Sequence, residues 1–337
     1  MASFAQFGND LHTGKRSFDI VGRRKTWYLV ALVALLVALV VPQLRGGFVF
    51  GIEFTGGSEF VVSQVAEQDQ GAATDAVTEV VPLAAPKVSS VSTTGIRVQT
   101  DQLTSNETRE VRAALADAYA VPVEQVTASF IGPTWGQDIS GQAVRGLLIF
   151  LVLAAIGMAL YFRTWKMSLA AMTALMHDLV ITAGIYGITG FEITPAAVIG
   201  FLTILGYSLY DTVVVFDKIR ENTSEAGAQT RTFAESVNLA VNQTLVRSIN
   251  TSVVAVLPVA SILFIGTFVL GAGTLRDISL ALLIGIVAGA YSTIFIASPL
   301  YAQIRSAEPG VRKTDLNVLA QRAKAGPAPK VAEQVRA

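Results

Sequence analysis

Six long apolar runs constrain the fold of this chain more than any other feature of its sequence. About 20 apolar residues in a helix, each rising 1.5 Å, cross the hydrocarbon core of a bilayer. Runs near that length lie at Trp27–Leu44, Val144–Phe162, Met167–Ile188, Thr194–Phe216, Ser248–Phe268 and Ile278–Leu300. Hydrophobic residues make up 52% of the chain and charged residues 15%, which is typical of membrane proteins. The sequence predicts an α-helical polytopic membrane protein with six transmembrane helices.

Lysine and arginine residues are distributed unevenly between the two sides of these runs. They are frequent before the first run, between runs two and three, between runs four and five, and after the sixth, whereas the opposite turns at 190–193 and 271–277 carry only Arg276. Short cytoplasmic loops carry the excess of positive charge. We therefore expect residues 1–26 and 301–337 to be cytoplasmic, the first run at 27–44 to be an uncleaved anchor, and the tail to be disordered.

Residues 45–140 have a different character and predict an α+β domain on the external side. Runs rich in β-branched residues indicate strands, and two segments indicate helices, the second starting with a capping box of Thr104 and Glu107. The order is strand (59–65), helix (70–81), strand (87–91), strand (96–100), helix (104–119), strand (126–131). This order is that of a ferredoxin-like, split βαβ sandwich. Residues 141–300 then hold helices two to six.

The loop between runs four and five has a second amphipathic pattern. Thr232 and Glu235 have capping-box spacing, and Phe233, Val237, Ala240 and Val241 form one apolar stripe. This pattern predicts a helix lying on the cytoplasmic face of the membrane.

Asp211 is the most informative polar residue, because it lies well inside the fourth apolar run. A carboxylate at that depth costs about 2.5–3.5 kcal/mol on insertion scales, so it needs a partner or a water-filled cavity. Arg247 directly precedes the fifth run and lies at a comparable depth, so antiparallel neighbouring helices would bring the two within reach. Two interpretations follow: a proton relay in which protonation of Asp211 releases Arg247, or a static ion pair that joins two helices. We favour the relay.

Three further polar residues lie inside the apolar runs. Tyr207 shares a helix face with Asp211, and His177 and Asp178 lie at the middle of the third run. Each is a candidate for a secondary relay or for an interhelical hydrogen bond. By contrast, Gly285 and Gly289 in the sixth run are predicted to serve helix packing only.

Several classes of chemistry find no support in the sequence. The chain has no cysteine, two histidines and a formal net charge of zero, so we expect no thiolate or metal centre and no nucleic-acid partner. It also lacks a Walker loop, a Gly-x-Ser-x-Gly motif and zinc-binding histidine spacing. We therefore predict that the protein is not an enzyme and binds no cofactor, so that an ion gradient or a partner drives its work.

Five short motifs together resemble a known family over residues 19–300. They are Gly51-Ile-Glu-Phe-Thr-Gly-Gly57, His177-Asp178, the run from Tyr207 to Asn222, the run from Asn242 to Ser252, and Leu275-Arg-Asp277. With these motifs the chain resembles the SecD/SecF family of protein translocase subunits, part of the resistance-nodulation-division (RND) superfamily. Its external region of about 100 residues is similar in size to that of the SecF-type members and too small for the SecD type.

The resemblance implies a multi-pass protein of the bacterial cytoplasmic membrane. With a SecD-like subunit as its heterodimeric partner, it would use the proton motive force to promote late steps of protein export through the SecYEG channel and its SecA motor. Exported preproteins, YajC, YidC and membrane lipid are further implied partners. The family's relay residues fall on Asp211 and Arg247. Glu53 stands where the family usually has Asp, and Tyr210 stands where Asn commonly precedes the key Asp.

Two other functions fit the same sequence features. One is a scaffold that stabilises the translocon without conducting ions, and it would differ in its response to collapse of the proton gradient at fixed ATP. The other is half of a small-molecule exporter of the same superfamily, against which the modest external region argues, because it leaves little room for a drug-binding cleft.

Overall fold

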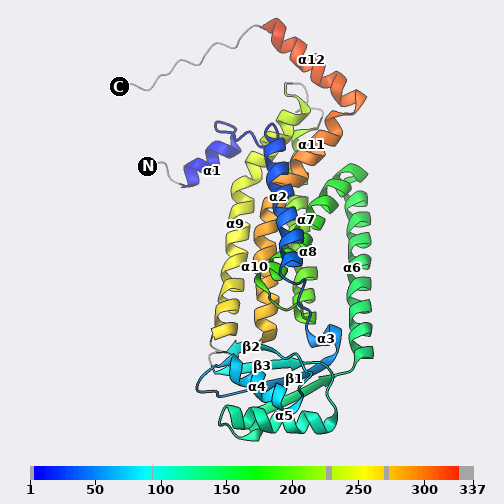
Figure 1. The fold of residues 1–337 in the computed structure, drawn as a ribbon. Helices are drawn as coiled ribbons and strands as arrows, with labels where there is room; N and C mark the ends of the chain where they lie inside the picture. Colours follow the sequence, from blue (N-terminus) through cyan, green and yellow to red (C-terminus); the bar gives the residue numbers. More distant parts are fainter. Residues whose placement is uncertain (1–3, 93, 225–229, 269–272, 326–337) are drawn as a thin grey trace, which may run out of the picture.

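Long helices form an elongated bundle with a small sheet at one end (Figure 1). The computed structural model describes residues 4–92, 94–224, 230–268 and 273–325. Within them, six helical segments are long and apolar enough to cross a membrane. These are α2 (Arg24–Leu44), α6 (Pro133–Phe162), α7 (Trp165–Thr189), α8 (Pro195–Asn222), α9 (Phe233–Phe268) and α10 (Gly273–Ser292), the last continuing through a π-helical segment η2 (Thr293–Ala297) into α11 (Ser298–Ser306). The expected six long apolar helices are therefore present.

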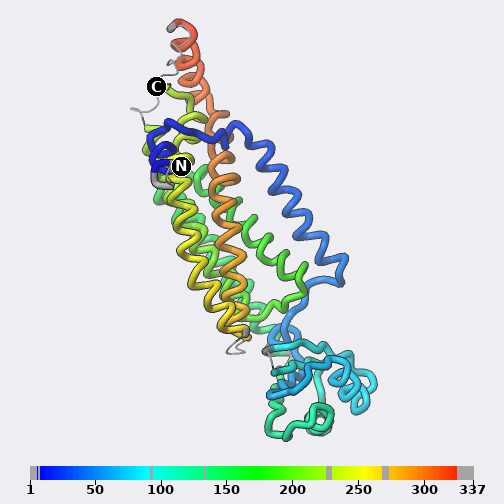
Figure 2. Tube along the Cα trace, turned by 90° about the vertical axis from the view of Figure 1, so that its left-hand side faces the viewer, coloured from blue at the N-terminus to red at the C-terminus, as the bar shows by residue number. Residues whose placement is uncertain are grey.

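The bundle has a tightly packed centre and loosely attached outer helices. In the apolar windows of α7, α8 and α10–α11, 50%, 44% and 56% of residues are buried, against 6% in α6 and 6% in α9. Figure 1 shows α6 standing apart from the other long helices along much of its length, and Figure 2 shows α2 running along one side of the bundle. Much of the apolar surface of α6 and α9 is thus left for lipid or for other helices.

Glycines bring the central helices close together. A Cβ atom on Gly200 of α8 would lie 2.6 Å from Cβ of Ala281 on α10, and one on Gly285 of α10 would lie 2.2 Å from Ile204 on α8. Side chains at these positions would push the two helices apart. The α8–α10 contact therefore depends on small residues, as expected for helices in lipid.

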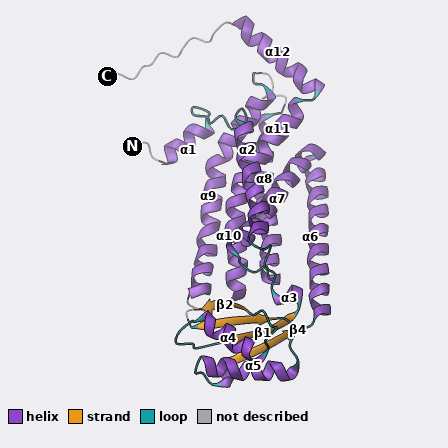
Figure 3. Ribbon diagram, viewed as in Figure 1, coloured by secondary structure: helices purple, strands orange, loops and turns teal. Residues whose placement is uncertain are grey.

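The sheet belongs to a domain inserted between α2 and α6. Its element order is α3 (Ile52–Thr55), β1 (Gly57–Val62), α4 (Gln70–Val80), β2 (Lys87–Ser92), β3 (Gly95–Thr100), α5 (Ser105–Ala118), the short 3₁₀ helix η1 (Val123–Gln125) and β4 (Val126–Ile131). The strands pair antiparallel in the order β2-β3-β1-β4, with Phe60 opposite Val98 and Ala128. The predicted β-α-β-β-α-β order is present. Figure 3 shows the four strands between the helix bundle and helices α4 and α5.

Local sequence signals account for this domain. Phe60, Val98, Val111 and Leu115 are fully buried between the sheet and its helices. The predicted capping box at the start of α5 is confirmed, since Thr104 Oγ1 accepts a hydrogen bond from the Glu107 backbone and the Glu107 carboxylate accepts one from the Thr104 backbone. Two glycines with positive φ, Gly56 (76°) and Gly57 (140°), lead from α3 into β1.

The segment predicted as a separate surface helix is instead the start of α9. Its capping box forms as expected, with Glu235 N donating to Thr232 Oγ1 and Thr232 N donating to the Glu235 carboxylate. No glycine or proline lies at residues 233–257 to separate this segment from the rest, and the helix continues to Phe268 with Pro258 inside it. The apolar stripe of Val237, Ala240 and Val241 is fully buried against the bundle, so this segment does not lie flat on a membrane surface.

The tail also differs from expectation, because much of it is helical rather than disordered. After α11, helix α12 (Pro309–Ala325) is fixed to the start of α9. Asp315 accepts a hydrogen bond from the Phe233 backbone at 2.8 Å, and the Arg322 guanidinium contacts the Glu235 carboxylate at 2.7 Å. Residues 326–337 of the predicted disordered tail lie outside the described residues. At the same end of the bundle, helix α1 (Phe4–His12) lies beside α9.

Candidate functional site

A set of buried polar side chains crosses the centre of the bundle. We call it the polar layer; its members come from α7, α8, α9, α10 and η2, and each is at most 6% exposed: Asp178, Ser208, Asp211, Thr212, Ser248, Ser292 and Thr293. Apolar side chains alone would pack these helices. Polar groups inside lipid are costly unless they find partners, and they often mark functional sites.

Asp178 on α7 joins three helices through one oxygen atom. Its Oδ2 accepts hydrogen bonds from Ser208 Oγ on α8 at 2.6 Å and from Ser292 Oγ on α10 at 2.8 Å. Gly289 lies over this contact, and a Cβ there would come within 3.1 Å of Ser208 Oγ and 3.5 Å of Asp178 Oδ2. Gly289 therefore packs as predicted, and its lack of a side chain also admits the buried carboxylate.

His177 contacts the polar layer only through Asp178, and its ring faces an apolar groove. Its Nδ1 lies 3.2 Å from Oδ1 of Asp178, and its ring stacks at 5.9 Å from that of Tyr291. The ring lines an apolar groove of about 540 Å³ between α2, α7 and α10. Asp178 thus makes the interhelical hydrogen bonds considered for this pair, whereas His177 contacts Asp178 itself.

Asp211 on α8 lies against α9, as predicted, and is 6% exposed. Its Oδ1 accepts a hydrogen bond from Ser248 Oγ at 2.8 Å. Its Oδ2 is buried and has no hydrogen-bond partner among the described residues. The neighbouring Thr212 Oγ1 lies 2.9 Å from Thr293 Oγ1. A buried carboxylate with one free oxygen and hydroxyl neighbours can accept and release a proton.

Arg247 does not form the expected direct contact with Asp211. The Arg247 side chain is exposed on the outer face of α9, and among the described residues no carboxylate lies within 4.0 Å of it. The physical reason is helix rotation: successive residues point about 100° apart, and α9 turns Ser248 rather than Arg247 towards Asp211. Arg247 is therefore exposed on α9, near enough for its charge to act on Asp211 but without an ion pair to it.

The two tyrosines of this region take different places. Tyr207 lies one turn from Asp211 on α8, and its hydroxyl is buried. Tyr210 is 56% exposed, so this departure from the family pattern lies on the outer surface of α8 and not beside the Asp211 carboxylate.

The π-helical segment η2 is the main irregularity beside the polar layer. It begins at Thr293, directly after Ser292, and Ser298 Oγ donates to the Thr293 carbonyl five residues earlier. Single π-helical turns inside α-helices are frequent at functional sites. Ser208 shares a predicted polar face of the fourth run with Tyr207 and Asp211. The sequence did not single out Ser248, Ser292 or Thr293, although each is a hydroxyl residue inside an apolar run, which is the signal that marks them.

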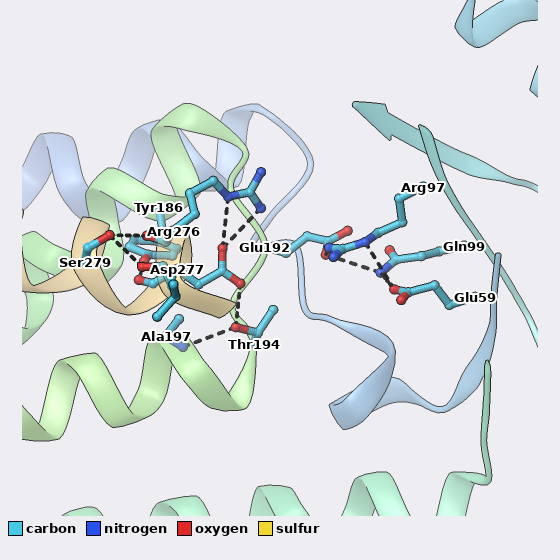
Figure 4. A network of polar contacts seen from close by, with 11 residues as sticks. Glu59, Arg97, Gln99, Tyr186, Glu192, Thr194, Ala197, Arg276, Asp277 and Ser279 are labelled. Atoms are coloured by element: carbon cyan, nitrogen blue, oxygen red, sulfur yellow. Dashed lines mark hydrogen bonds and ion pairs between the residues drawn. The ribbon is translucent and has the colours of Figure 1, made fainter. Parts of the chain in front are cut away.

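A second polar network lies where the sheet domain meets the bundle (Figure 4). Arg97 on β3 lies 3.4 Å from the carboxylate of Glu59 on β1 and 3.4 Å from that of Glu192, in the turn between α7 and α8. Gln99 Nε2 donates to the same two carboxylates at 3.0 and 3.2 Å. Burial raises the pKa of Glu192 above its ordinary value, with Arg97 opposing that shift. Burial likewise raises the pKa of Glu53 on α3.

Arg276 and Asp277 form a neighbouring network at the start of α10. Arg276 contacts Oδ1 of Asp277 at 3.1 Å, and Oδ2 of Asp277 accepts from Thr194 Oγ1 at 2.9 Å. The Tyr186 hydroxyl donates to the Asp277 carbonyl at 2.8 Å. These bonds tie together the ends of α7, α8 and α10 (Figure 4). In the described part of the chain, no group of three or more His, Cys, Asp or Glu side chains is placed to hold a metal ion.

The sequence of this chain is similar to those of known protein translocase subunits. The family described as "Protein export membrane protein SecD/SecF, C-terminal" matches residues 110–307. The chain is 44% identical over 329 residues to protein translocase subunit SecF of Streptomyces coelicolor, covering 96% of this chain and 86% of that one. It is 41% identical over 336 residues to SecF of Mycobacterium tuberculosis (strain CDC 1551 / Oshkosh), covering 96% and 75%.

The fold is similar to that of a larger protein. The crystal structure of SecDF from Thermus thermophilus, a translocon-associated membrane protein, superimposes with a TM-score of 0.75 at 29% identity. The match covers 86% of this chain and 39% of SecDF. A second SecDF structure, in a super-membrane-facing form, matches with a TM-score of 0.60 at 28% identity, covering 92% of this chain and 40% of that one.

Proposed function

Because the chain belongs to the SecD/SecF family of protein export membrane proteins, we propose that it is the SecF-type subunit of a protein translocase and draws on the proton motive force to promote late steps of export. A role in protein translocation follows from its SecF and SecDF relatives. We propose that it is an accessory transport subunit and not an enzyme, and that the coupling to the proton gradient resides in the polar layer.

Asp211 is the proposed proton-binding group, and its environment is the observation that carries the proposal. It is a carboxylic acid inside an apolar span, with one oxygen bonded to Ser248 and the other without a partner among the described residues. Intramembrane ionisable residues are rare and mark ion paths. Protonation would remove the charge that Ser248 solvates and weaken the α8–α9 contact. Asp178, His177 and Tyr207 are proposed as secondary members of the path.

A SecD-like subunit is the proposed partner, in a heterodimer. The Thermus thermophilus protein that matches this chain is a single SecDF chain, and the match covers 38% of it. A separate subunit would supply the remainder. The exposed Arg247, on a helix whose apolar window is only 6% buried, would then face an acidic group of that subunit. In this arrangement the arginine acts on Asp211 from the interface, without the direct ion pair.

The wider assembly is proposed from family membership. It comprises the SecYEG channel, SecA, exported preproteins, and YajC and YidC as further partners, in the cytoplasmic membrane of a bacterium. The sheet domain would lie outside, and both termini, with α1 and α12, would lie in the cytoplasm, as the positions of Lys and Arg favour. The competing functions are a scaffold without ion flux and half of a small-molecule exporter. If the protein is only a scaffold, collapse of the proton gradient at fixed ATP should leave its effect on export unchanged.

The substitution Asp211→Asn tests the relay directly. Asparagine keeps the shape and an acceptor for Ser248 but cannot cycle a proton, so assembly with the partner should persist. Export driven by a proton gradient at fixed ATP, followed in membrane vesicles, should fall to the rate measured after the gradient is collapsed. Asp217→Asn, on the same helix but hydrogen-bonded to Tyr161 near its end, is the matched control and should leave gradient-driven export intact.

Normal gradient-driven export by the Asp211→Asn protein would make Asp211 a structural residue. Export that is indifferent to the gradient in the unmodified protein would instead favour the scaffold. Arg247→Met should also abolish the gradient effect, and it should weaken co-purification of the SecD-like subunit, which Asp211→Asn should not.

A further inference from the structure

The contact between the sheet domain and the bundle carries more negative than positive charge. We call the set Glu53, Glu59, Arg97, Gln99 and Glu192 the junction cluster. It contains three carboxylates and one guanidinium, and the Arg97, Glu59 and Glu192 side chains are only 16%, 18% and 14% exposed. Of the other cations nearby, Arg276 is already engaged by Asp277 at 3.1 Å, and Lys87 on β2 lies opposite Gln99 in the strand register. The cluster therefore lacks the positive charge to neutralise all of its carboxylates.

The cluster divides between two parts of the chain. Glu59, Arg97 and Gln99 belong to the sheet. Glu192 belongs to the α7–α8 turn, and α3, which carries Glu53, packs on the start of α6, where a Cβ on Gly136 would lie 2.5 Å from the Phe54 carbonyl oxygen. Arg97 also touches the beginning of α10, since a Cβ on Gly273 would lie 3.1 Å from its Nη2. Sheet and bundle thus meet across these polar side chains.

Short chain connections allow the sheet to move on this contact. The chain enters the sheet through Gly56 and Gly57, both with positive φ, and leaves it through Gly132 into α6. Glycines of this kind can absorb the dihedral changes of a hinge.

We propose that the junction cluster is a proton-responsive clamp. Uptake of a proton by Glu192 or Glu53 strengthens the contact that holds the sheet domain on the ends of α7 and α10, and release of that proton loosens it.

The direction of the effect follows from charge and burial. Oε2 of Glu53 is buried and has no hydrogen-bond partner among the described residues, so its ionised form is poorly solvated. Burial raises the pKa of Glu53 and of Glu192 in the docked domain, while in an undocked domain water would return both towards the ordinary value. A group with the higher pKa in the docked state binds its proton more tightly there. Docking is therefore most favoured below the ordinary glutamate pKa, and this gain is lost as the pH rises from that value through the raised pKa values.

The charged neighbours of Glu192 agree with this direction. Glu59 on β1 and Glu53 on α3 raise its pKa, and only Arg97 on β3 and the Gln99 amide lower it. On α10, Arg276 and Asp277 contribute a paired charge of each sign. The clamp goes beyond the proposed relay, because it lies outside the membrane-spanning segments and would respond to the solution beside the sheet, whichever group carries protons through the bundle.

Distance measurements between two spin labels test the clamp in the full chain. The sequence has no cysteine, so Ser105→Cys on the sheet domain and Ser261→Cys on α9, both exposed, give one defined pair. In lipid nanodiscs, lowering the pH from about 8 to about 4, below the ordinary glutamate pKa, should narrow the distance distribution and raise the docked fraction, tenfold in the docking equilibrium for each pKa unit of difference. An unchanged distribution, or one that broadens at low pH, would overturn the proposal.

Variants separate the clamp from other pH effects. Glu192→Gln mimics the protonated side chain and should stay docked at both pH values, whereas Arg97→Gln should be undocked at the higher pH and regain docking in acid. Glu79→Gln, an exposed change on α4, should behave like the unmodified chain. Asp211→Asn should retain the response even where proton-driven export is lost, which distinguishes failure of the clamp from failure of the relay. A Glu192→Gln protein that undocks would show that the ion pair holds the domain, and would refute the clamp.

Discussion

At the scale of single residues, one carboxylate oxygen holds three helices of the bundle in register. Oδ2 of Asp178 on α7 receives both the Ser208 hydroxyl from α8 and the Ser292 hydroxyl from α10. Each serine compensates for the loss of the other, because a buried acceptor needs at least one donor. The two hydrogen bonds should therefore be energetically coupled.

A double-mutant cycle at Ser208 and Ser292 measures this coupling. Each single change to alanine should lower the free energy of unfolding by about 0.5–1.5 kcal/mol, since one donor remains on Asp178. The double change should cost more than the sum, with a coupling of roughly 0.5–3 kcal/mol, because the carboxylate is then left without either serine. Thermal unfolding of the purified chain in mild detergent is the measurement. Ser261→Ala, whose hydroxyl bonds only within α9, is the control, and strict additivity at Asp178 would contradict the coupling.

The candidate site was predictable in part from single residues. The depth of Asp211 in an apolar run can be predicted from the sequence, because it depends only on counting residues. The residue that contacts Asp211 cannot be predicted in this way. Arg247 and Ser248 are adjacent, and only the rotation of α9 decides which one faces α8. The junction partners Arg97 and Glu192 are 95 residues apart, and no local pattern connects them.

At the scale of elements, the α8–α10 contact sets the spacing of the central helices. Gly200 allows that contact, since a Cβ there would meet Cβ of Ala281 at 2.6 Å and the Ile278 carbonyl oxygen at 3.1 Å. Gly206, on the same helix, has nothing within 4 Å of the corresponding position. Gly200 is therefore tightly packed against α10 and Gly206 is not, so the two glycines of one helix can be compared directly.

Substitution of these glycines by alanine should separate packing from helix propensity. Gly200→Ala should destabilise the chain by about 1–3 kcal/mol, because both helices must shift to admit the methyl group. Gly206→Ala should be neutral or stabilising by up to about 1 kcal/mol, as alanine favours the helix. Unfolding midpoints of the two purified variants in the same detergent decide the matter. Equal effects at both positions would show that the close approach of α8 and α10 contributes nothing.

The boundaries of helices and strands could be predicted where residues close in the sequence determine them. The strand β4 matches its predicted range of 126–131, and α5 starts at its capping box. The first strand begins earlier than predicted because the Gly56–Gly57 turn starts it. Helix α12 was not predicted, because the composition of this segment indicates only that it is polar. Its contacts, Asp315 with Phe233 and Arg322 with Glu235, are made with residues some 80 positions earlier in the chain.

At the scale of the whole molecule, the arrangement places the sheet domain at one end of the bundle and α1 and α12 at the other (Figure 1). The charge distribution predicts which end faces which compartment. Cysteines introduced singly at Ser105 and Ser224 into this cysteine-free chain can be labelled in intact cells with a membrane-impermeant maleimide. Ser105→Cys should react and Ser224→Cys should react only after the membrane is permeabilised. The reverse pattern would invert the proposed topology.

Helix α9 has a mechanical consequence for both ends of the molecule. Its 36 residues make a rod of roughly 54 Å, while the hydrocarbon core measures about 30 Å. One end is anchored to α12 through Glu235, and the other reaches the level of the sheet. For a rigid rod of this length, a tilt of about 5° at the anchored end would displace the opposite end by roughly 5 Å. A tilt set off by a change in the hydrogen bond between Ser248 and Asp211, near the middle of the rod, would therefore move the end beside the sheet by about the length of a side chain.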